Sequence, residues 1–223
     1  MALSDTLVFI HGWGVNSSVW RHQIEYFSNK YYTNAPELNS LTLYPTPCTL
    51  HPVLIGWSYG GMRAIEMASK YPEKFKALVL VGCSAKFSDG MNPVIIRNIT
   101  RNLKRGFEAT MRNCYGTFFS AEETGFIDEF VERQRLPDKE ETIELLDKLA
   151  ALDLRGLLKD INMPTLIIHG DGDEVCPMQA GEYLYKNIKD SKLEVIKGAG
   201  HMPFYTRPQK FNSVLKEFIE GVE

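Results

Sequence analysis

Three residues of this chain, Ser58, Asp173 and His201, have the types and the order that nucleophilic catalysis requires. A serine hydroxyl is a poor nucleophile near neutral pH, so it needs a histidine base within hydrogen-bond reach, and a carboxylate must orient that base. Each residue alone could be structural, the serine and the aspartate in turns and the histidine in a buried loop. Together, each directly beyond an apolar strand-like run, they predict a Ser-His-Asp triad.

Ser58 is the central residue of the sequence Gly-Trp-Ser-Tyr-Gly at 56–60. An apolar run at 52–55 precedes this pattern, and a helix-like stretch at 61–68 follows it. A strand, a Gly-x-Ser-x-Gly turn and a helix form a nucleophile elbow, in which the serine takes a strained backbone conformation and the glycines avoid steric collisions. The start of the helix would place the backbone N–H of Tyr59 beside a developing oxyanion.

A second oxyanion donor is expected from the glycine-rich loop at 11–14, which follows the strand-like run at 7–10 and precedes a helix at about 18–27. Loops of this kind supply a backbone N–H in Gly-x-Ser-x-Gly hydrolases, and Trp13 is the residue placed to donate it. We interpret His11 as a residue that fixes this loop rather than as a base.

Of the five histidines, His201 alone follows a late strand-like run, at 193–196, in a glycine-flanked loop. We therefore predict that it is the general base. The carboxylate should come from the loop after the preceding strand, at 164–168, which offers Asp171 and Asp173. We prefer Asp173, because the Val-Cys-Pro segment beyond it should fold the loop back, whereas Asp171 lies beside two glycines and is better explained as a turn residue. The order serine, aspartate, histidine is that of the α/β-hydrolase template.

Strand-like runs alternate with helical stretches, which is typical of a parallel sheet covered by helices on both faces. The strand candidates are 6–10, 52–55, 77–81, 164–168 and 193–196, and a closing amphipathic helix is expected at 209–219. We predict an α/β fold of the α/β-hydrolase class with a mostly parallel sheet. The length of 223 residues favours a single domain that spans 1–223.

Residues from about 88 to 158 have helical periodicity and no strand-like run, so we expect a helical lid inserted into this domain. Six basic and two acidic side chains give its first part a local net charge of +4. These residues are Lys86, Arg97, Arg101, Lys104, Arg105 and Arg112, with Asp89 and Glu108. Arg97, Arg101 and Arg105 are spaced by four and lie along one helix face; we call them the basic stripe. The stripe is either a solvated helix surface or a docking site for an acidic or phosphate-bearing partner. The acidic second part, 122–147, is expected to be exposed.

The bulk composition argues against several classes of protein. No apolar run approaches the roughly 20 residues that span a bilayer. A net charge of −3 does not indicate nucleic acid as a partner. The strand-like run at 6–10 leaves no room for a signal sequence, so we expect a cytoplasmic location. Cys48, Cys83, Cys114 and Cys176 are scattered, so we expect free thiols and neither a metal nor an organic cofactor.

Several motifs together resemble the pimeloyl-[acyl-carrier protein] methyl ester esterases of biotin synthesis. They lie at 11–14, 56–61, 71–73, 77–79, 83–87 and 201–204. The resemblance implies a carboxylesterase that hydrolyses the methyl ester of pimeloyl-acyl-carrier protein. The residues that it implies for substrate binding are Trp13, Ser58, Tyr59, His201 and the stretch from Cys114 to Phe118. The acidic carrier protein would dock on the basic stripe and Arg112.

Two differences from that family affect the expected sheet. The first strand-like run corresponds to the family's usual third strand, so we expect a sheet without the leading hairpin. The region 28–51 lacks the expected Gly-x-Gly-x-Ser turn and the helix after it, although 41–44 is a short strand candidate. Prolines at 45, 47 and 52 oppose a helix there. We therefore expect a smaller sheet. We also expect the protein to be a monomer.

Four other functions use the same fold. A general carboxylesterase for short acyl esters would have the same triad, with the basic stripe incidental. A haloperoxidase-like enzyme or a C–C bond hydrolase would also use this triad. A non-catalytic ligand-binding homologue would be expected to have a broken triad, whereas all three residues are present here.

Overall fold

The computed structural model describes residues 5–41 and 51–222. Within them, six strands form one sheet in the order β2-β1-β3-β4-β5-β6, and every neighbouring pair is parallel. The strands are β1 (Thr6–Ile10), β2 (Tyr32–Asn34), β3 (Val53–Trp57), β4 (Ala77–Val81), β5 (Thr165–Gly170) and β6 (Ser191–Ile196). The predicted α/β fold with a mostly parallel sheet is therefore confirmed.

The central strands β3, β4 and β5 are buried along their whole length. Their continuous apolar sequences pack against helices on both faces, as parallel strands do. The register places Ile55 beside Val79 and Val79 beside Leu166. Because all carboxyl ends of a parallel sheet meet at one edge, the loops after these strands converge there.

The edge strand β2 was not predicted. Its three residues are half-buried or exposed, so no hydrophobic pattern marks it, and it is defined by its pairing with β1. The strand candidate at 41–44 falls almost entirely on residues 42–50, which lie outside the described residues, as does Cys48. The other three cysteines, Cys83, Cys114 and Cys176, are free thiols.

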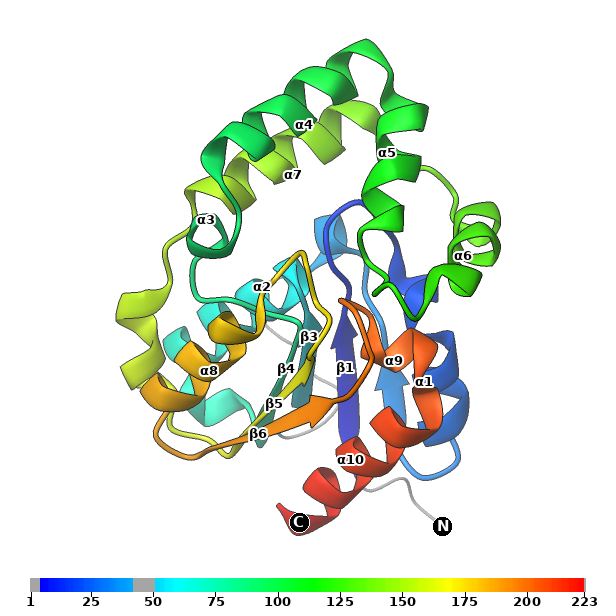
Figure 1. The fold of residues 1–223 in the computed structure, drawn as a ribbon. Coiled ribbons are helices and arrows are strands. Elements are labelled where there is room, and N and C mark those ends of the chain that lie inside the picture. Colours follow the sequence, from blue (N-terminus) through cyan, green and yellow to red (C-terminus); the bar gives the residue numbers. More distant parts are fainter. Residues whose placement is uncertain (1–4, 42–50, 223) are drawn as a thin grey trace.

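Helices cover both faces of the sheet. Figure 1 shows α1 (Arg21–Phe27) and α10 (Pro208–Gly221) on one side, and α2 (Tyr59–Lys70) and α8 (Met178–Asn187) on the other. The short helix α9 (Pro203–Thr206) packs against α10 and α1. Short 3-10 helices are η1 (Ser17–Trp20), η2 (Leu38–Ser40), η3 (Pro72–Lys74), η4 (Thr124–Phe126) and η5 (Arg155–Asp160). No helix among the described residues has both the length and the apolar character needed to cross a membrane.

Five helices between β4 and β5 lie above the carboxyl ends of the strands, and we call them the cap helices (Figure 1). They are α3 (Phe87–Gly90), α4 (Pro93–Arg105), α5 (Phe107–Gly116), α6 (Ile127–Arg133) and α7 (Lys139–Ala151). Helix α4 begins where the Asn92 side chain accepts the N–H of Val94, with Pro93 in the first turn. It buries Ile96 and Leu103 and leaves its arginines outside.

The prediction that the acidic stretch 122–147 is exposed is wrong at Glu123. Its side chain is fully buried, because the carboxylate accepts hydrogen bonds from two backbone N–H groups and from Arg207. A charge pattern predicts exposure only when no partner is available, and two of these partners, Gly200 and Arg207, come from a distant part of the chain.

Candidate active site

Ser58 lies at a sharp turn between β3 and α2, with φ of 55° and ψ of −122°. A positive φ is unusual for a residue with a side chain, and such strain persists only where the surroundings enforce it. Here the N–H of Ser58 donates to the carbonyl of Val81 at 2.9 Å, which ties the turn to β4. The strained turn holds the hydroxyl at the carboxyl end of the sheet.

The turn depends on Gly60, because a Cβ at this position would overlap the backbone carbonyl oxygens of Ile10 and His11. We expect Gly60→Ala to lower the free energy of unfolding by about 3 kcal/mol or more, since backbone on both sides must move apart. Urea denaturation followed by circular dichroism measures this loss.

The matched control is Gly116→Ala at the end of α5, where a Cβ meets no heavy atom within 4 Å. This variant should be unchanged or more stable by up to about 1 kcal/mol, because alanine restricts the unfolded chain. Equal stabilities for the two variants would contradict the close approach at Gly60.

Asp173 and His201 form a buried hydrogen-bonded pair in which Nδ1 of His201 donates to Oδ2 of Asp173 at 2.7 Å. The other carboxylate oxygen accepts the N–H groups of Val175 and Cys176 at 2.9 and 2.8 Å. Two backbone N–H groups thus hold the carboxylate in place against the imidazole, as general-base catalysis requires. Asp171, the alternative acid, is exposed and does not join this pair.

Ser58 and His201 line the same cavity, which has a volume of about 50 Å³. Three further residues expected in the substrate site, Trp13, Cys114 and Phe118, also line it. The remaining lining residues are mostly apolar: Trp57, Phe87, Met91, Ile99, Thr117, Leu146, Leu149 and Val175. The side chain of Tyr59 is buried but does not line this cavity, so only its backbone can serve there. Among the described residues, no group of His, Cys, Asp and Glu side chains is placed to hold a metal ion.

Comparison with known proteins agrees with this geometry. Residues 50–208 match the family model for the α/β hydrolase fold. The chain belongs to the α/β-hydrolase family. A protein of Wigglesworthia glossinidia brevipalpis named pimeloyl-[acyl-carrier protein] methyl ester esterase is 31% identical over 244 residues, which cover 97% of this chain and 94% of that protein. A protein of the same name from Aliivibrio fischeri is 28% identical, over 96% of this chain and 93% of its own length.

A solved esterase structure from Exiguobacterium antarcticum is similar at a TM-score of 0.84 and 22% identity, and the match covers 99% of this chain and 93% of that one. At this identity the likeness shows the fold alone. The predicted fold family and the resemblance to the methyl ester esterases are confirmed by these comparisons.

In this α/β-hydrolase, two segments that lie beside Ser58 carry candidate oxyanion donors. Tyr59 is the first residue of α2, so its N–H has no acceptor within the helix. The loop of Trp13 lies close on the other side, because a Cβ on Gly12 would be 3.1 Å from the Cβ of Ser58. Within the described chain, the N–H of Trp13 forms no hydrogen bond. The two N–H groups could therefore both bind an oxyanion.

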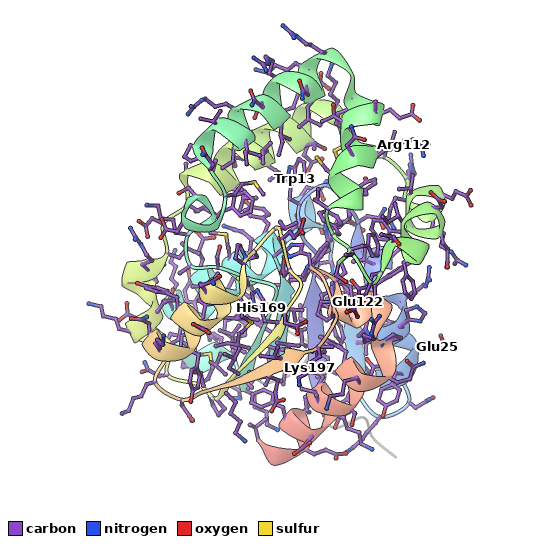
Figure 2. The ribbon with its side chains drawn as sticks, viewed as in Figure 1. Trp13, Glu25, Arg112, Glu122, His169 and Lys197 are labelled. Atoms are coloured by element: carbon purple, nitrogen blue, oxygen red, sulfur yellow. The ribbon has the colours of Figure 1, made fainter. Side chains whose placement is uncertain are left out.

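The loop that carries Trp13 is tied to the cap helices on two sides. The indole Nε1 of Trp13 donates to the carbonyl of Thr142 in α7 at 2.7 Å, and the hydroxyl of Tyr115 in α5 donates to the carbonyl of Gly14 at 2.8 Å. Figure 2 shows Trp13 between the sheet and the cap helices. The ring nitrogens of His11 contact the carbonyl of Gly12 and the carboxylate of Glu37, and burial lowers the pKa of this histidine.

His169 was missed by sequence reasoning. It lies near the end of β5 (Figure 2) and is fully buried. Its Nε2 donates to the carbonyl of Cys176 at 2.6 Å and lies 3.5 Å from Oδ2 of Asp173. Burial lowers its pKa, so the ring is neutral near pH 7. It braces the loop that holds Asp173. The sequence feature that could have identified it is a histidine directly before the glycine that ends the strand.

Proposed function

We propose that this α/β-hydrolase hydrolyses the methyl ester of pimeloyl-acyl-carrier protein, with Ser58, His201 and Asp173 as its catalytic triad. The observation that supports a hydrolase most strongly is that Ser58 and His201 line the same cavity, with Asp173 hydrogen bonded to the far nitrogen of the imidazole. The named activity of the two relatives supports the choice of substrate. The cytoplasmic location and the monomeric state expected from the sequence stay predictions.

The reaction follows from the placement of these groups. Oγ of Ser58 attacks the ester carbonyl carbon while Nε2 of His201 takes the hydroxyl proton, and Asp173 stabilises the imidazolium that forms. The carbonyl oxygen becomes an oxyanion and accepts the N–H groups of Trp13 and Tyr59. Methanol leaves with the proton from His201 and an acyl-enzyme remains. Water then attacks the acyl carbon, again with His201 as base, which frees the acid and restores Ser58.

The apolar lining of the cavity suits a methylene chain, but the volume does not suit a whole acyl group. About 50 Å³ is far below the roughly 300 Å³ at which ligand pockets begin. Phe87, Met91 and Leu146, from the cap region, close it from above. We therefore expect the cap helices to move away from the sheet when the acyl chain enters.

The carrier protein would dock on the basic stripe. Arg97, Arg101 and Arg105 are exposed on α4, and none forms an ion pair with a carboxylate of the described chain. Arg112, in contrast, is paired with Glu108 at 3.1 Å. The uncompensated positive charge is thus concentrated on α4, where it would attract an acidic surface.

We expect the combined reversal Arg97→Glu, Arg101→Glu and Arg105→Glu to raise KM for the carrier-bound ester by about tenfold or more, because complementary charge stabilises the encounter. The kinetic constants for p-nitrophenyl butyrate should stay within about twofold. Steady-state kinetics on both substrates measures the difference.

The matched control reverses three exposed lysines outside the cap helices, Lys192 of β6 and Lys210 and Lys216 of α10, and should change neither substrate's constants. An equal increase in KM for p-nitrophenyl butyrate in the α4 variant would contradict a docking role for the basic stripe.

The test of the function itself compares the hydrolysis rates of pimeloyl-acyl-carrier-protein methyl ester and p-nitrophenyl butyrate. A strong preference for the carrier-bound ester is the expected result. Turnover of the small ester alone would favour a general short-acyl carboxylesterase. Hydrolysis of neither would favour a non-catalytic homologue.

A further inference from the structure

The carboxylate of Glu123 lies beside the loop of the general base. It is fully buried after α5, and its Oε2 accepts the N–H groups of Ser120 at 3.0 Å and Gly200 at 2.7 Å. Its Oε1 accepts from Nη1 of Arg207 at 3.2 Å. A buried charge is costly unless it is hydrogen bonded and paired, and all these partners are present here. Since Gly200 directly precedes His201, this carboxylate contacts the backbone that carries the imidazole.

The same short segment, 118–123, holds the base loop at further points. The N–H of His201 donates to the carbonyl of Phe118 at 2.8 Å, and the hydroxyl of Ser120 donates to the carbonyl of Gly198 at 2.9 Å. A Cβ on Gly200 would lie 2.6 Å from the nitrogen of Ser120, so the two backbones touch. The segment therefore fixes the peptide units before and at His201.

The ring of His201 has a separate restraint. Asp173 accepts the hydrogen bond from Nδ1 of the ring. The indole N–H of Trp57 donates to the backbone carbonyl of His201 at 2.8 Å, so it restrains the backbone and not the ring. The carboxylate of Asp173 can orient a ring only if the Cα that bears it is already in place. A displacement of about 1 Å in a catalytic group can slow a reaction about 10²-fold.

We infer that Glu123 is a positioning residue for the general base: by accepting the N–H of Gly200, it sets the backbone from which His201 reaches both Ser58 and Asp173. The inference rests on the proposed hydrolase function. It assigns the effect to the position of the acceptor oxygen, and it assigns to Arg207 only the neutralisation of the buried charge.

Two conservative variants separate position from charge. Glu123→Asp keeps the charge but withdraws the oxygens by about 1.5 Å, one C–C bond, so kcat for p-nitrophenyl butyrate should fall about tenfold or more with KM within about twofold. Glu123→Gln loses the charge but keeps an oxygen for the N–H groups of Ser120 and Gly200, so kcat should stay within about threefold.

Arg207→Met serves as the control for the ion pair. It should lower Tm because the carboxylate loses its counter-charge, and it should leave kcat of the folded protein within about threefold. The rate at which a fluorophosphonate labels Ser58 is measured in all variants, because it reports activation of the serine by His201 without an ester substrate.

The reverse order, with Glu123→Gln impaired and Glu123→Asp like wild type, would overturn the inference, as would two variants that both equal wild type. Losses in both variants that follow only the amount of folded protein, seen by circular dichroism, would also overturn it. Wild-type protein that hydrolyses no ester would count against the proposed function, and the labelling rates would then decide the role of Glu123 independently.

Discussion

Ser58→Ala is expected to lower kcat for p-nitrophenyl butyrate by roughly 10⁴-fold or more, because alanine offers no atom that can attack the ester carbonyl. Residual hydrolysis would come from the oxyanion donors and from binding alone. The backbone at this residue has φ of 55°, a strain that serine and alanine share, so the free energy of unfolding should change little. Steady-state kinetics and urea denaturation measure the two quantities.

The matched control for this change is Ser213→Ala, at an exposed serine of α10 that is remote from the cavity. It should leave both kcat and stability unchanged. A fluorophosphonate should label wild type and the control, with the adduct on Ser58, and should leave Ser58→Ala unlabelled. Full activity of Ser58→Ala would reject the nucleophile assignment, and with it the mechanism proposed above.

Asp173→Asn is expected to lower kcat by about 10³- to 10⁴-fold. The asparagine oxygen can keep the hydrogen bonds from the N–H groups of Val175 and Cys176. Its NH₂ group would then face Nδ1 of His201, where a donor meets a donor and the imidazole must adopt the wrong tautomer. The fold should survive, because no volume is lost, so kinetics and thermal melting together distinguish a chemical defect from unfolding.

Asp171→Asn is the control, since Asp171 lies only two residues away and is exposed. Its Oδ1 accepts the N–H of Gly198 at 2.7 Å, and an amide oxygen can accept that hydrogen bond equally well. We expect a change in kcat of less than about threefold. A large loss at Asp171 with a small one at Asp173 would reverse the assignment of the acid.

Local sequence was sufficient for those parts of the fold whose signal is local. The apolar runs predicted β1, β3 and β4 within a few residues, and the Gly-x-Ser-x-Gly pattern predicted the turn where Ser58 has its positive φ. The choice of Asp173 over Asp171 depended on how one short loop folds back, and the structure has Asp173 at 2.7 Å from His201.

The features that were missed depend on partners far away in the chain. Strand β2 exists because Tyr32–Asn34 pairs with β1, although its side chains are half-buried or exposed. Glu123 is buried because Gly200 and Arg207 offer donors about 80 positions later, and no periodicity encodes that encounter. Such contacts follow from the assembled sheet rather than from any window of sequence. His169 is different: Asp173 lies only four positions later, and their contact depends on how the short loop after β5 folds back.

Two hydrogen bonds that join the chain between 107 and 151 to the catalytic loops end on backbone carbonyls, and this affects how the sequence can diverge. Trp13 and His201 donate to the backbone carbonyls of Thr142 and Phe118, which any residue type would provide. Side chains at those two positions can therefore diversify to suit new acyl groups while the hydrogen bonds persist. An insertion or deletion between 107 and 151 would instead shift the carbonyls themselves. We therefore expect new substrate ranges to arise by substitutions in cap helices of constant length. A change of length would displace the loop of Trp13 and the loop of His201 at the same time.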